Sequence, residues 1–210
     1  AYLKSYDHVY GMINGISGLL YEEIMDLSQF KDKELRESLV KTPAMYLGSC
    51  RFKISKDDNH LKEKIINILL KYEIDDFFYI GGNDSMDTIM KLDQYAKMNN
   101  IKIHFIGIPK TIDNDLLHTL YTPGYPSACQ YVSTTLLEIA YDSRIYPMKS
   151  ITIVEIMGRD AGWLTAASAI VNEVEEDTID FICMPEIPFD KENFLIQLKN
   201  KLQQKQHIII

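Results

Sequence analysis

Short apolar runs alternate along the chain with longer segments in which apolar residues recur at helical spacing. That alternation is typical of βαβ units on a parallel sheet. The expected strands are rich in β-branched and aromatic residues; they are residues 8–13, 76–80, 104–108, 151–157, 181–184 and 207–210. The expected helices are residues 58–73, 85–98, 126–141, 161–171 and 190–205. The pattern therefore predicts an α/β fold with mostly parallel sheets.

One break in this alternation predicts a domain boundary. The stretch YTPGYP, near Leu120 to Tyr125, carries two prolines and a glycine, which end regular elements. We expect an α/β domain over 1–122 and the first part of a second over 123–210. The first residues are typical of the middle of a helix, and the last expected strand stops without a following loop, so we expect a chain truncated at both ends.

Composition excludes several classes of function. The formal net charge of -8 disfavours binding to nucleic acid or to a membrane surface, which needs clustered Lys and Arg. No apolar stretch reaches the roughly 18 residues of a membrane span, and the N-terminus lacks the order of a signal peptide. The cysteines Cys50, Cys129 and Cys183 have no metal-ligand spacing, so we expect reduced thiols in a cytoplasmic protein.

Ligands of open α/β sheets bind at the carboxyl ends of the strands, and the first such segment here is IGGNDSMDT. Gly81 and Gly82 follow an expected strand and let the backbone approach an anion closely. Ser85 is expected to open a helix, whose N-terminal N–H groups favour phosphate. The alternative is a plain strand-to-helix turn with Asp84 or Ser85 as the N-cap.

The second segment is GIPKTIDND. Asp113 and Asp115 are two residues apart, so in an extended loop their side chains point to the same side. One carboxylate could then act as a base while the other approaches a metal ion. Lys110 and Thr111 add a cation and a hydroxyl. The alternative is a solvated turn rich in Asp and Asn.

The third segment is VEIMGRDAGWLTAASAI, in which a strand ends at Met157 and Gly158 and a helix of small residues starts near Ala161. The guanidinium of Arg159 could bind a phosphate or a developing charge, or alternatively form a surface ion pair with Asp160 or Glu155. Trp163 is expected to fill a gap in the core.

These three segments, in this order and at these separations, resemble the phosphofructokinase family. HVYGMINGISGLL, YLGSCRF and TPGYPSA extend the resemblance over essentially the whole chain. It implies a three-layer, Rossmann-like phosphofructokinase fold. It also implies a glycolytic activity, the transfer of a phosphoryl group to the 1-hydroxyl of fructose 6-phosphate with Mg²⁺ as cofactor.

The resemblance implies a role for each matching residue. Asp113 would be the general base and Asp115 would help to place Mg²⁺. Thr111 would hydrogen-bond the phosphoryl group in flight, and Arg159 would neutralise charge in the transition state. The sugar-phosphate pocket would be lined by Met157, Gly158, Thr111 and Arg159, and the donor-phosphate pocket by Arg51, Gly81, Gly82, Asp84, Ser85 and Lys110.

Two positions favour pyrophosphate over ATP as the donor. Members that use ATP typically have glycine where this chain has Asp84 and Lys110, whereas members that use pyrophosphate resemble this chain at both. A carboxylate at Asp84 would crowd and repel the α-phosphate of a nucleotide. Lys110 would add charge where pyrophosphate lacks the rest of a nucleotide.

Several expectations limit this interpretation. Asn83 stands where many members carry a metal-binding aspartate, so the metal would depend more on Asp115 or Asp84. The family's first strand should precede Ala1, and the residues that bind the 6-phosphate should follow Ile210, so we expect this chain alone to be inactive. In related enzymes a neighbouring subunit contributes arginines to the sugar pocket, so the resemblance implies a homo-oligomer.

Two alternatives remain open. The first is an ATP-dependent 6-phosphofructokinase. The second is a non-catalytic family member that binds sugar phosphate or metabolites and regulates a partner. Intact Asp113 and Arg159 disfavour the second alternative, because a regulatory copy needs neither a base nor a charge stabiliser.

Overall fold

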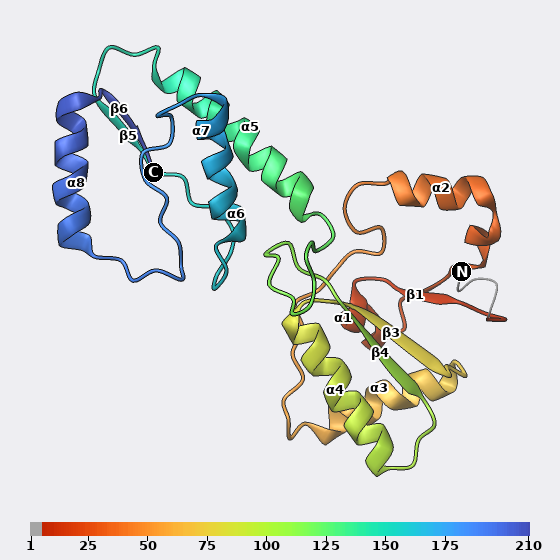
Figure 1. Ribbon diagram of the computed structural model, residues 1–210. Helices are drawn as coiled ribbons and strands as arrows, with labels where there is room; N and C mark the ends of the chain where they lie inside the picture. The colour runs from red at the N-terminus through yellow and green to blue at the C-terminus, as the bar shows by residue number, and fades with distance from the viewer. Residues whose placement is uncertain (1–5) are drawn as a thin grey trace. The chain divides into compact units, whose positions relative to one another are not determined.

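The structure is a computed structural model that describes residues 6–210. It contains two compact units, Ala1–Pro109 and Lys110–Ile210 (Figure 1). The helix expected at the start of the chain falls on residues 1–5, outside the described residues.

The first unit pairs a small antiparallel sheet with a parallel one. β1 (Tyr10–Met12) pairs antiparallel with β2 (Ile24–Asp26), and β3 (Asp76–Gly81) pairs parallel with β4 (His104–Pro109). The remaining elements of this unit are α1 (Gly15–Leu20), the 3-10 helix η2 (Ser28–Lys31), α2 (Lys33–Lys41), α3 (Asn59–Lys71) and α4 (Asn83–Met98).

The core of the first unit lies where α1, α3 and α4 pack with β3 (Figure 1). Phe77 and Tyr79 alternate along β3 and are buried, as are Ile65 of α3 and Leu92 of α4. Helix α3 begins where the carboxylate of Asp58 accepts the N–H of Leu61, which satisfies one of the free N–H groups of its first turn. The apolar faces predicted from sequence are therefore the faces that the unit buries.

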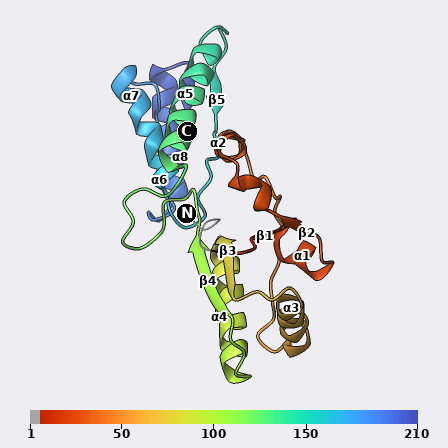
Figure 2. The same ribbon diagram turned by 90° about the vertical axis from the view of Figure 1, so that its right-hand side faces the viewer.

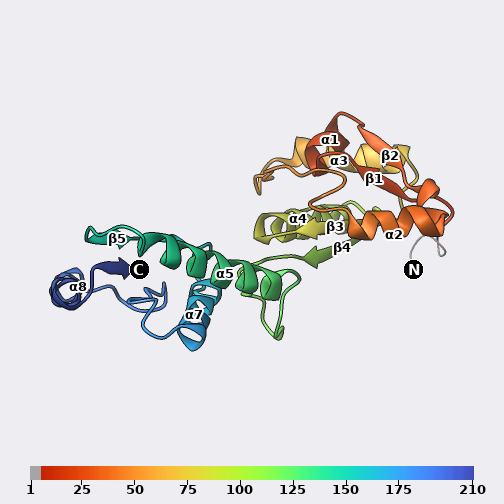
Figure 3. The same ribbon diagram turned by 90° about the horizontal axis from the view of Figure 1, so that it is seen from above.

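The second unit pairs β5 (Ser150–Thr152) parallel with β6 (His207–Ile209). Its helices are α5 (Tyr125–Ser143), α6 (Trp163–Ala166), η3 (Ala167–Ala169), α7 (Ile170–Val174) and α8 (Lys191–Gln204). Helix α5 packs beside α7, as Figures 2 and 3 show from two further directions. The buried core of this unit is formed by Leu136, Ala140, Val171, Ile179 and Ile209.

A buried carboxylate ties α8 to this core. The side chain of Asp180 is fully buried and accepts hydrogen bonds from Lys201 and Lys205 at 3.0 and 2.8 Å. It also accepts the backbone N–H of Ile209 at 3.0 Å. Lys201 in the last turn of α8 and Lys205 just after the helix thus neutralise one buried charge, as burial of an ion requires.

Several expected elements differ in the structure. The strand expected at 181–184 is absent: Asp180 and Phe181 both donate to the carbonyl of Ile209, and no ladder continues beyond them. The strand expected at 151–157 is confined to β5, because its partner β6 is three residues long. The helix expected at 161–171 is divided into α6, η3 and α7.

The boundary between the units also differs from the one expected between residues 122 and 123. The side chain of Asn114 bonds to the backbone of Leu120 and Thr122, and Thr122 bonds in turn to Tyr125 at the start of α5. These bonds tie the loop that follows β4 to the second unit, so the division falls at Pro109.

None of the helices formed by residues 6–210 combines the length and apolar character that crossing a bilayer requires. Cys50, Cys129 and Cys183 are free thiols, as the spacing of the cysteines predicts.

Candidate active site

The first segment predicted to carry chemistry lies at the carboxyl edge of the β3–β4 pair. Gly81 is paired with Pro109, so the chain leaves both strands at the same edge. Such edges hold ligands in open α/β sheets. Gly81, Gly82 and the start of α4 therefore occupy the position that the sequence predicted for them.

The N-terminus of α4 is open. The helix begins at Asn83, not at Ser85 as expected, and its N-cap is Gly82, with no side-chain cap. The N–H of Ser85 bonds to the carbonyl of Gly82, whereas those of Asn83 and Asp84 have no acceptor within residues 6–210. The N-cap role considered for Asp84 or Ser85 is therefore wrong, and two N–H groups remain free for an anion.

The side chain of Ser85 lies close to Gly81 and Tyr79. A β-carbon built on Gly81 would lie 2.1 Å from Oγ of Ser85, so only glycine lets the backbone pass so close to this hydroxyl. Ser85 and Cys50 interact with the hydroxyl of Tyr79, and burial raises the pKa of Tyr79. Sequence reasoning missed Tyr79, whose pattern position indicates only core packing.

Asp84 has a partner that the sequence did not suggest. Nζ of Lys53 lies 3.0 Å from Oδ1 of Asp84 in the first turn of α4. This pair places Arg51, two residues before Lys53, in a segment that approaches α4. Arg51 itself is exposed and forms no hydrogen bond or ion pair with any described residue.

The second segment forms a compact loop after β4. The hydroxyl oxygen of Thr111 accepts the backbone N–H of Asp113 at 3.0 Å. Asp113 is half-buried, while Lys110 and Asp115 are exposed. No described residue forms an ion pair or side-chain hydrogen bond with Lys110 or with either carboxylate, so all three charges remain available to a ligand.

Asn114 organises this loop. It is 8% exposed, its backbone is left-handed with φ 59°, and its Nδ2 donates to the carbonyl of Leu120 at 3.1 Å. Asn tolerates this conformation better than most residues. The loop is therefore not extended between Asp113 and Asp115, and the premise from which we expected their side chains to point the same way is wrong.

The third segment, which follows β5, turns sharply at Gly158. Gly158 has φ 138°, and a β-carbon there would lie 2.3 Å from the carbonyl oxygen of Ala161. Oε1 of Glu186 accepts the N–H of Gly162 at 2.7 Å, which ties the turn to a distant segment. Sequence reasoning did not single out Glu186.

Met157 and Arg159 are exposed on either side of Gly158. Arg159 pairs with neither Asp160 nor Glu155, nor with any other acid of the described chain, so the surface ion pair considered for it does not form. Trp163 is 53% exposed; the expectation that it fills the core is wrong, because it opens the short helix α6 at the surface.

The start of α5 is joined to the start of α6. The hydroxyl of Tyr125 donates to the carbonyl of Trp163 at 3.3 Å. Burial, followed by the neighbouring thiol of Cys129, raises the pKa of Tyr125 to about 12. The hydroxyl of Tyr125 therefore links the first turns of α5 and α6.

The site residues thus fall into three groups. Gly81, Gly82, Asn83, Asp84 and Ser85 are brought together in the first unit; Lys110, Thr111, Asp113 and Asp115 share one loop of the second unit; Met157, Gly158 and Arg159 share another. Within the second unit, no hydrogen bond or ion pair among described residues joins Asp113 to Arg159.

Each unit carries one oxygen donor expected to contact Mg²⁺. Asn83 of the first unit has an exposed amide, and Asp115 of the second unit has an exposed carboxylate. No cluster of three or more His, Cys, Asp or Glu side chains that could hold a metal occurs within residues 6–210. Mg²⁺ commonly uses one or two carboxylates together with substrate phosphates, and the exposed carboxylate of Asp115 alone suits that mode of binding.

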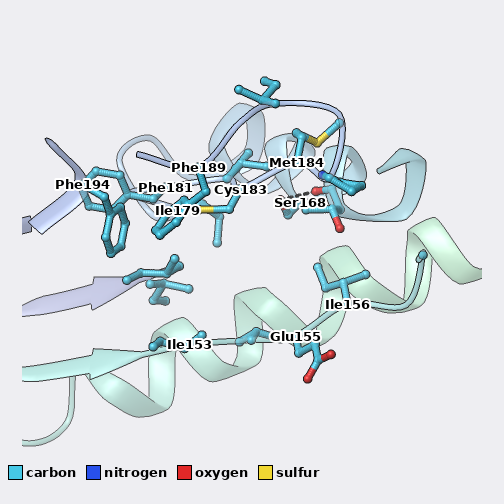
Figure 4. A pocket seen from close by; sticks show the side chains of 18 of the residues that line it. Ile153, Glu155, Ile156, Ser168, Ile179, Phe181, Cys183, Met184, Phe189 and Phe194 are labelled. Carbon is cyan, nitrogen blue, oxygen red and sulfur yellow. Dashed lines mark hydrogen bonds between the residues drawn. The ribbon is translucent and has the colours of Figure 1, made fainter. Parts of the chain in front are cut away.

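A pocket of about 660 Å³ lies beside the third segment. Figure 4 shows Ile153 and Ile156 on one wall and Phe181 and Phe189 on the other. Gly158 reaches its lining, but most of the lining is apolar. Such a surface suits carbon better than phosphate, so this pocket does not supply the phosphate contacts of the site.

A family model described as Phosphofructokinase matches residues 1–210. The chain belongs to the phosphofructokinase family. It is 35% identical over 206 residues to the pyrophosphate--fructose 6-phosphate 1-phosphotransferase of Halomonas elongata, covering 96% of this chain and 49% of that protein. It is 36% identical to the ATP-dependent 6-phosphofructokinase of Teredinibacter turnerae, covering 96% of this chain and 58% of that protein.

Solved structures of the family share the fold. The pyrophosphate-dependent phosphofructokinase of Nitrosospira multiformis matches with a TM-score of 0.83 at 32% identity, over 99% of this chain and 53% of that chain. The predicted three-layer α/β phosphofructokinase fold is therefore confirmed. The chain spans about half the length of the curated relatives it matches.

Proposed function

We propose that the protein transfers a phosphoryl group from pyrophosphate to the 1-hydroxyl of fructose 6-phosphate, giving fructose 1,6-bisphosphate. The observation that carries this proposal is Asp84 in the first turn of α4, beside two free helix N–H groups. These N–H groups favour a phosphate, while the aspartate restricts the space next to it. Such a cradle suits a donor that is no larger than its phosphates.

The loop after β4 would carry the chemistry. Asp113, half-buried and unpaired within the described chain, would take the proton of the 1-hydroxyl so that the oxygen attacks phosphorus in line. Thr111 accepts the N–H of Asp113 through its oxygen, which leaves the hydroxyl hydrogen free to donate to the phosphoryl group. Arg159 would neutralise the charge that builds in the transition state.

The sugar and the donor would meet different parts of the site. Met157, Gly158, Thr111 and Arg159 would line the sugar-phosphate pocket, and Arg51, Gly81, Gly82, Ser85 and Lys110 would contact the donor. Asp115, with Asn83, would hold Mg²⁺, which supplies charge neutralisation to the phosphates when bound.

Overall identity separates the two donors only narrowly. Relatives named for pyrophosphate are 35–38% identical to this chain, and those named for ATP are 31–36% identical. The proposal therefore depends on Asp84 and Lys110. The carboxylate of Asp84 would crowd a nucleotide, and the charge of Lys110 would help to hold pyrophosphate.

A coupled assay of the intact protein with each donor tests the proposal. We expect turnover with pyrophosphate and Mg²⁺ at least about a hundredfold better in kcat/KM than with ATP, which corresponds to about 2.7 kcal/mol of discrimination. A preference for ATP would establish the ATP-dependent alternative. Absence of turnover with both donors, with retained binding of fructose 6-phosphate, would establish the non-catalytic one.

The remaining expectations belong to the same proposal. A cytoplasmic location agrees with the three free thiols, and a homo-oligomer agrees with the subunit-shared sugar pocket that the family resemblance implies. Sedimentation of the intact protein measures the number of subunits directly.

A further inference from the structure

A carboxylate at Asp84 raises an electrostatic difficulty for the proposed function. Pyrophosphate carries several negative charges, so a free carboxylate in the first turn of α4 would repel it as strongly as it repels a nucleotide. Charge alone at Asp84 therefore cannot select pyrophosphate. Something must offset that charge while leaving the bulk of the side chain in place.

Lys53 supplies the offsetting charge. Its Nζ lies 3.0 Å from Oδ1 of Asp84, and the two side chains are 74% and 60% exposed. A pair this exposed contributes little to stability. Its main effect is local: the first turn of α4 presents a neutral ion pair and two free N–H groups instead of a net negative charge.

The segment that bears Lys53 is anchored to α4. Ile54 is 1% exposed within the first-unit core, and its carbonyl oxygen accepts a hydrogen bond from Nζ of Lys91 at 2.7 Å. Lys91 lies on α4 and also pairs with Asp87 one turn earlier at 2.5 Å. The backbone next to Lys53 is thus attached to the same helix that carries Asp84.

We propose that Lys53 is a donor-specificity residue that neutralises Asp84, so that Asp84 excludes a nucleotide by its size without repelling pyrophosphate. This inference rests on the proposed use of pyrophosphate. It assigns a function to Lys53, which lies two residues after Arg51 and for which the sequence motifs predict no function.

A single and a double variant of the intact protein test the inference. Lys53→Met removes the cation and leaves the Asp84 charge free, so KM for pyrophosphate should rise about tenfold, the order expected for one partly screened charge. KM for fructose 6-phosphate should stay within about twofold. Adding Asp84→Asn removes the exposed charge, and KM for pyrophosphate in the double variant should return to within about threefold of wild type.

Lys56→Met is the matched control, because Lys56 is an exposed lysine three residues along the same segment and its side chain has no partner within residues 6–210. It should leave both KM values unchanged. Thermal midpoints of the Lys53 variants should match wild type, since the pair is exposed.

Each departure from these results has one meaning. An unchanged KM for pyrophosphate in Lys53→Met overturns the role of Lys53 while the proposed function stands. A double variant as weak as Lys53→Met overturns neutralisation, because Lys53 would then act on the donor directly. A wild-type protein that uses ATP and not pyrophosphate overturns the proposed function itself, and this inference with it.

Discussion

Oδ1 of Asn114 accepts the backbone N–H of Thr122 at 2.8 Å, and this bond closes the loop that carries Asp113 and Asp115. The side-chain nitrogen Nδ2 of Asn114 donates to the carbonyl oxygen of Leu120. Asn114 thus uses both ends of its side chain to hold the loop from inside. The carboxylates of Asp113 and Asp115 on either side of it form no ion pair or side-chain hydrogen bond within residues 6–210.

Replacing Asn114 with alanine should therefore affect turnover more than binding. Loss of both hydrogen bonds leaves the N–H of Thr122 and the carbonyl of Leu120 without their partners, at a cost of about 1–3 kcal/mol, and frees the loop. We expect kcat to fall at least about tenfold with a smaller change in either KM, measured by steady-state kinetics. Asn200→Ala, an exposed asparagine on α8, is the control, and equal losses in both variants would contradict the role of Asn114.

Removing the proposed base should abolish most of the activity. Asp113→Asn keeps the size of the side chain, and the backbone N–H of residue 113 can still donate to the hydroxyl oxygen of Thr111. Any loss of turnover therefore reports the missing proton acceptor. We expect kcat to fall at least about a hundredfold, while KM for both substrates changes little. Asp142→Asn, at an exposed acid near the end of α5, should be neutral. Near wild-type turnover in Asp113→Asn would contradict the assignment of Asp113 as the general base.

The donor preference should move with two side chains. Asp84→Gly combined with Lys110→Gly removes the bulk that crowds a nucleotide and the cation that favours pyrophosphate. We expect a gain in kcat/KM for ATP and a loss for pyrophosphate, each of at least about tenfold, measured with both donors on the same preparation. An unchanged ratio would show that other residues set the preference.

Gly81 should not tolerate a side chain. A β-carbon there would lie 2.1 Å from Oγ and 2.6 Å from the β-carbon of Ser85, so Gly81→Ala forces the turn and α4 apart. We expect a loss of about 1–3 kcal/mol in the free energy of unfolding, together with a higher KM for the donor. Adding Ser85→Gly removes the obstructing side chain and should restore part of the stability in urea titrations; no recovery would place the strain elsewhere.

Acid should weaken the second unit through Glu175. The hydroxyl of Tyr141, and then the guanidinium of Arg144, hold the pKa of Glu175 below its usual value. A depressed pKa in the folded state contributes stability above the unfolded value of about 4.3, and that stability is lost as the pH falls through the folded pKa. Glu175→Gln should therefore lose less stability than wild type between about pH 5 and pH 3, measured by urea unfolding at each pH. A parallel loss in both proteins would exclude this contribution.

Local patterns predicted much of the fold. The strands expected at 76–80 and 104–108 are confirmed as β3 and β4, and the helix expected at 58–73 is confirmed as α3. These elements bury strongly periodic apolar faces, which the sequence displays directly. The elements α1, β2, η2 and α2 were missed. The first three have only three to six residues, which are too few for a periodicity to register.

The strand expected at 181–184 shows the limit of such reasoning. Its residues suit a strand, but a strand exists only where a neighbour accepts its hydrogen bonds, and among residues 6–210 only Ile209 does so. The choice of neighbour depends on segments far apart in the chain.

The candidate site divides in the same way. By itself the sequence determined the phosphofructokinase family, the order of the glycine-rich, aspartate and arginine segments, and the presence of Asp84 and Lys110, because each is carried by consecutive residues. Only the tertiary structure decided that α4 is uncapped, that Asn114 bends the aspartate loop, and that Lys53 meets Asp84. Those relationships depend on how buried residues such as Ile54 anchor distant segments to one another, and no local pattern encodes that packing.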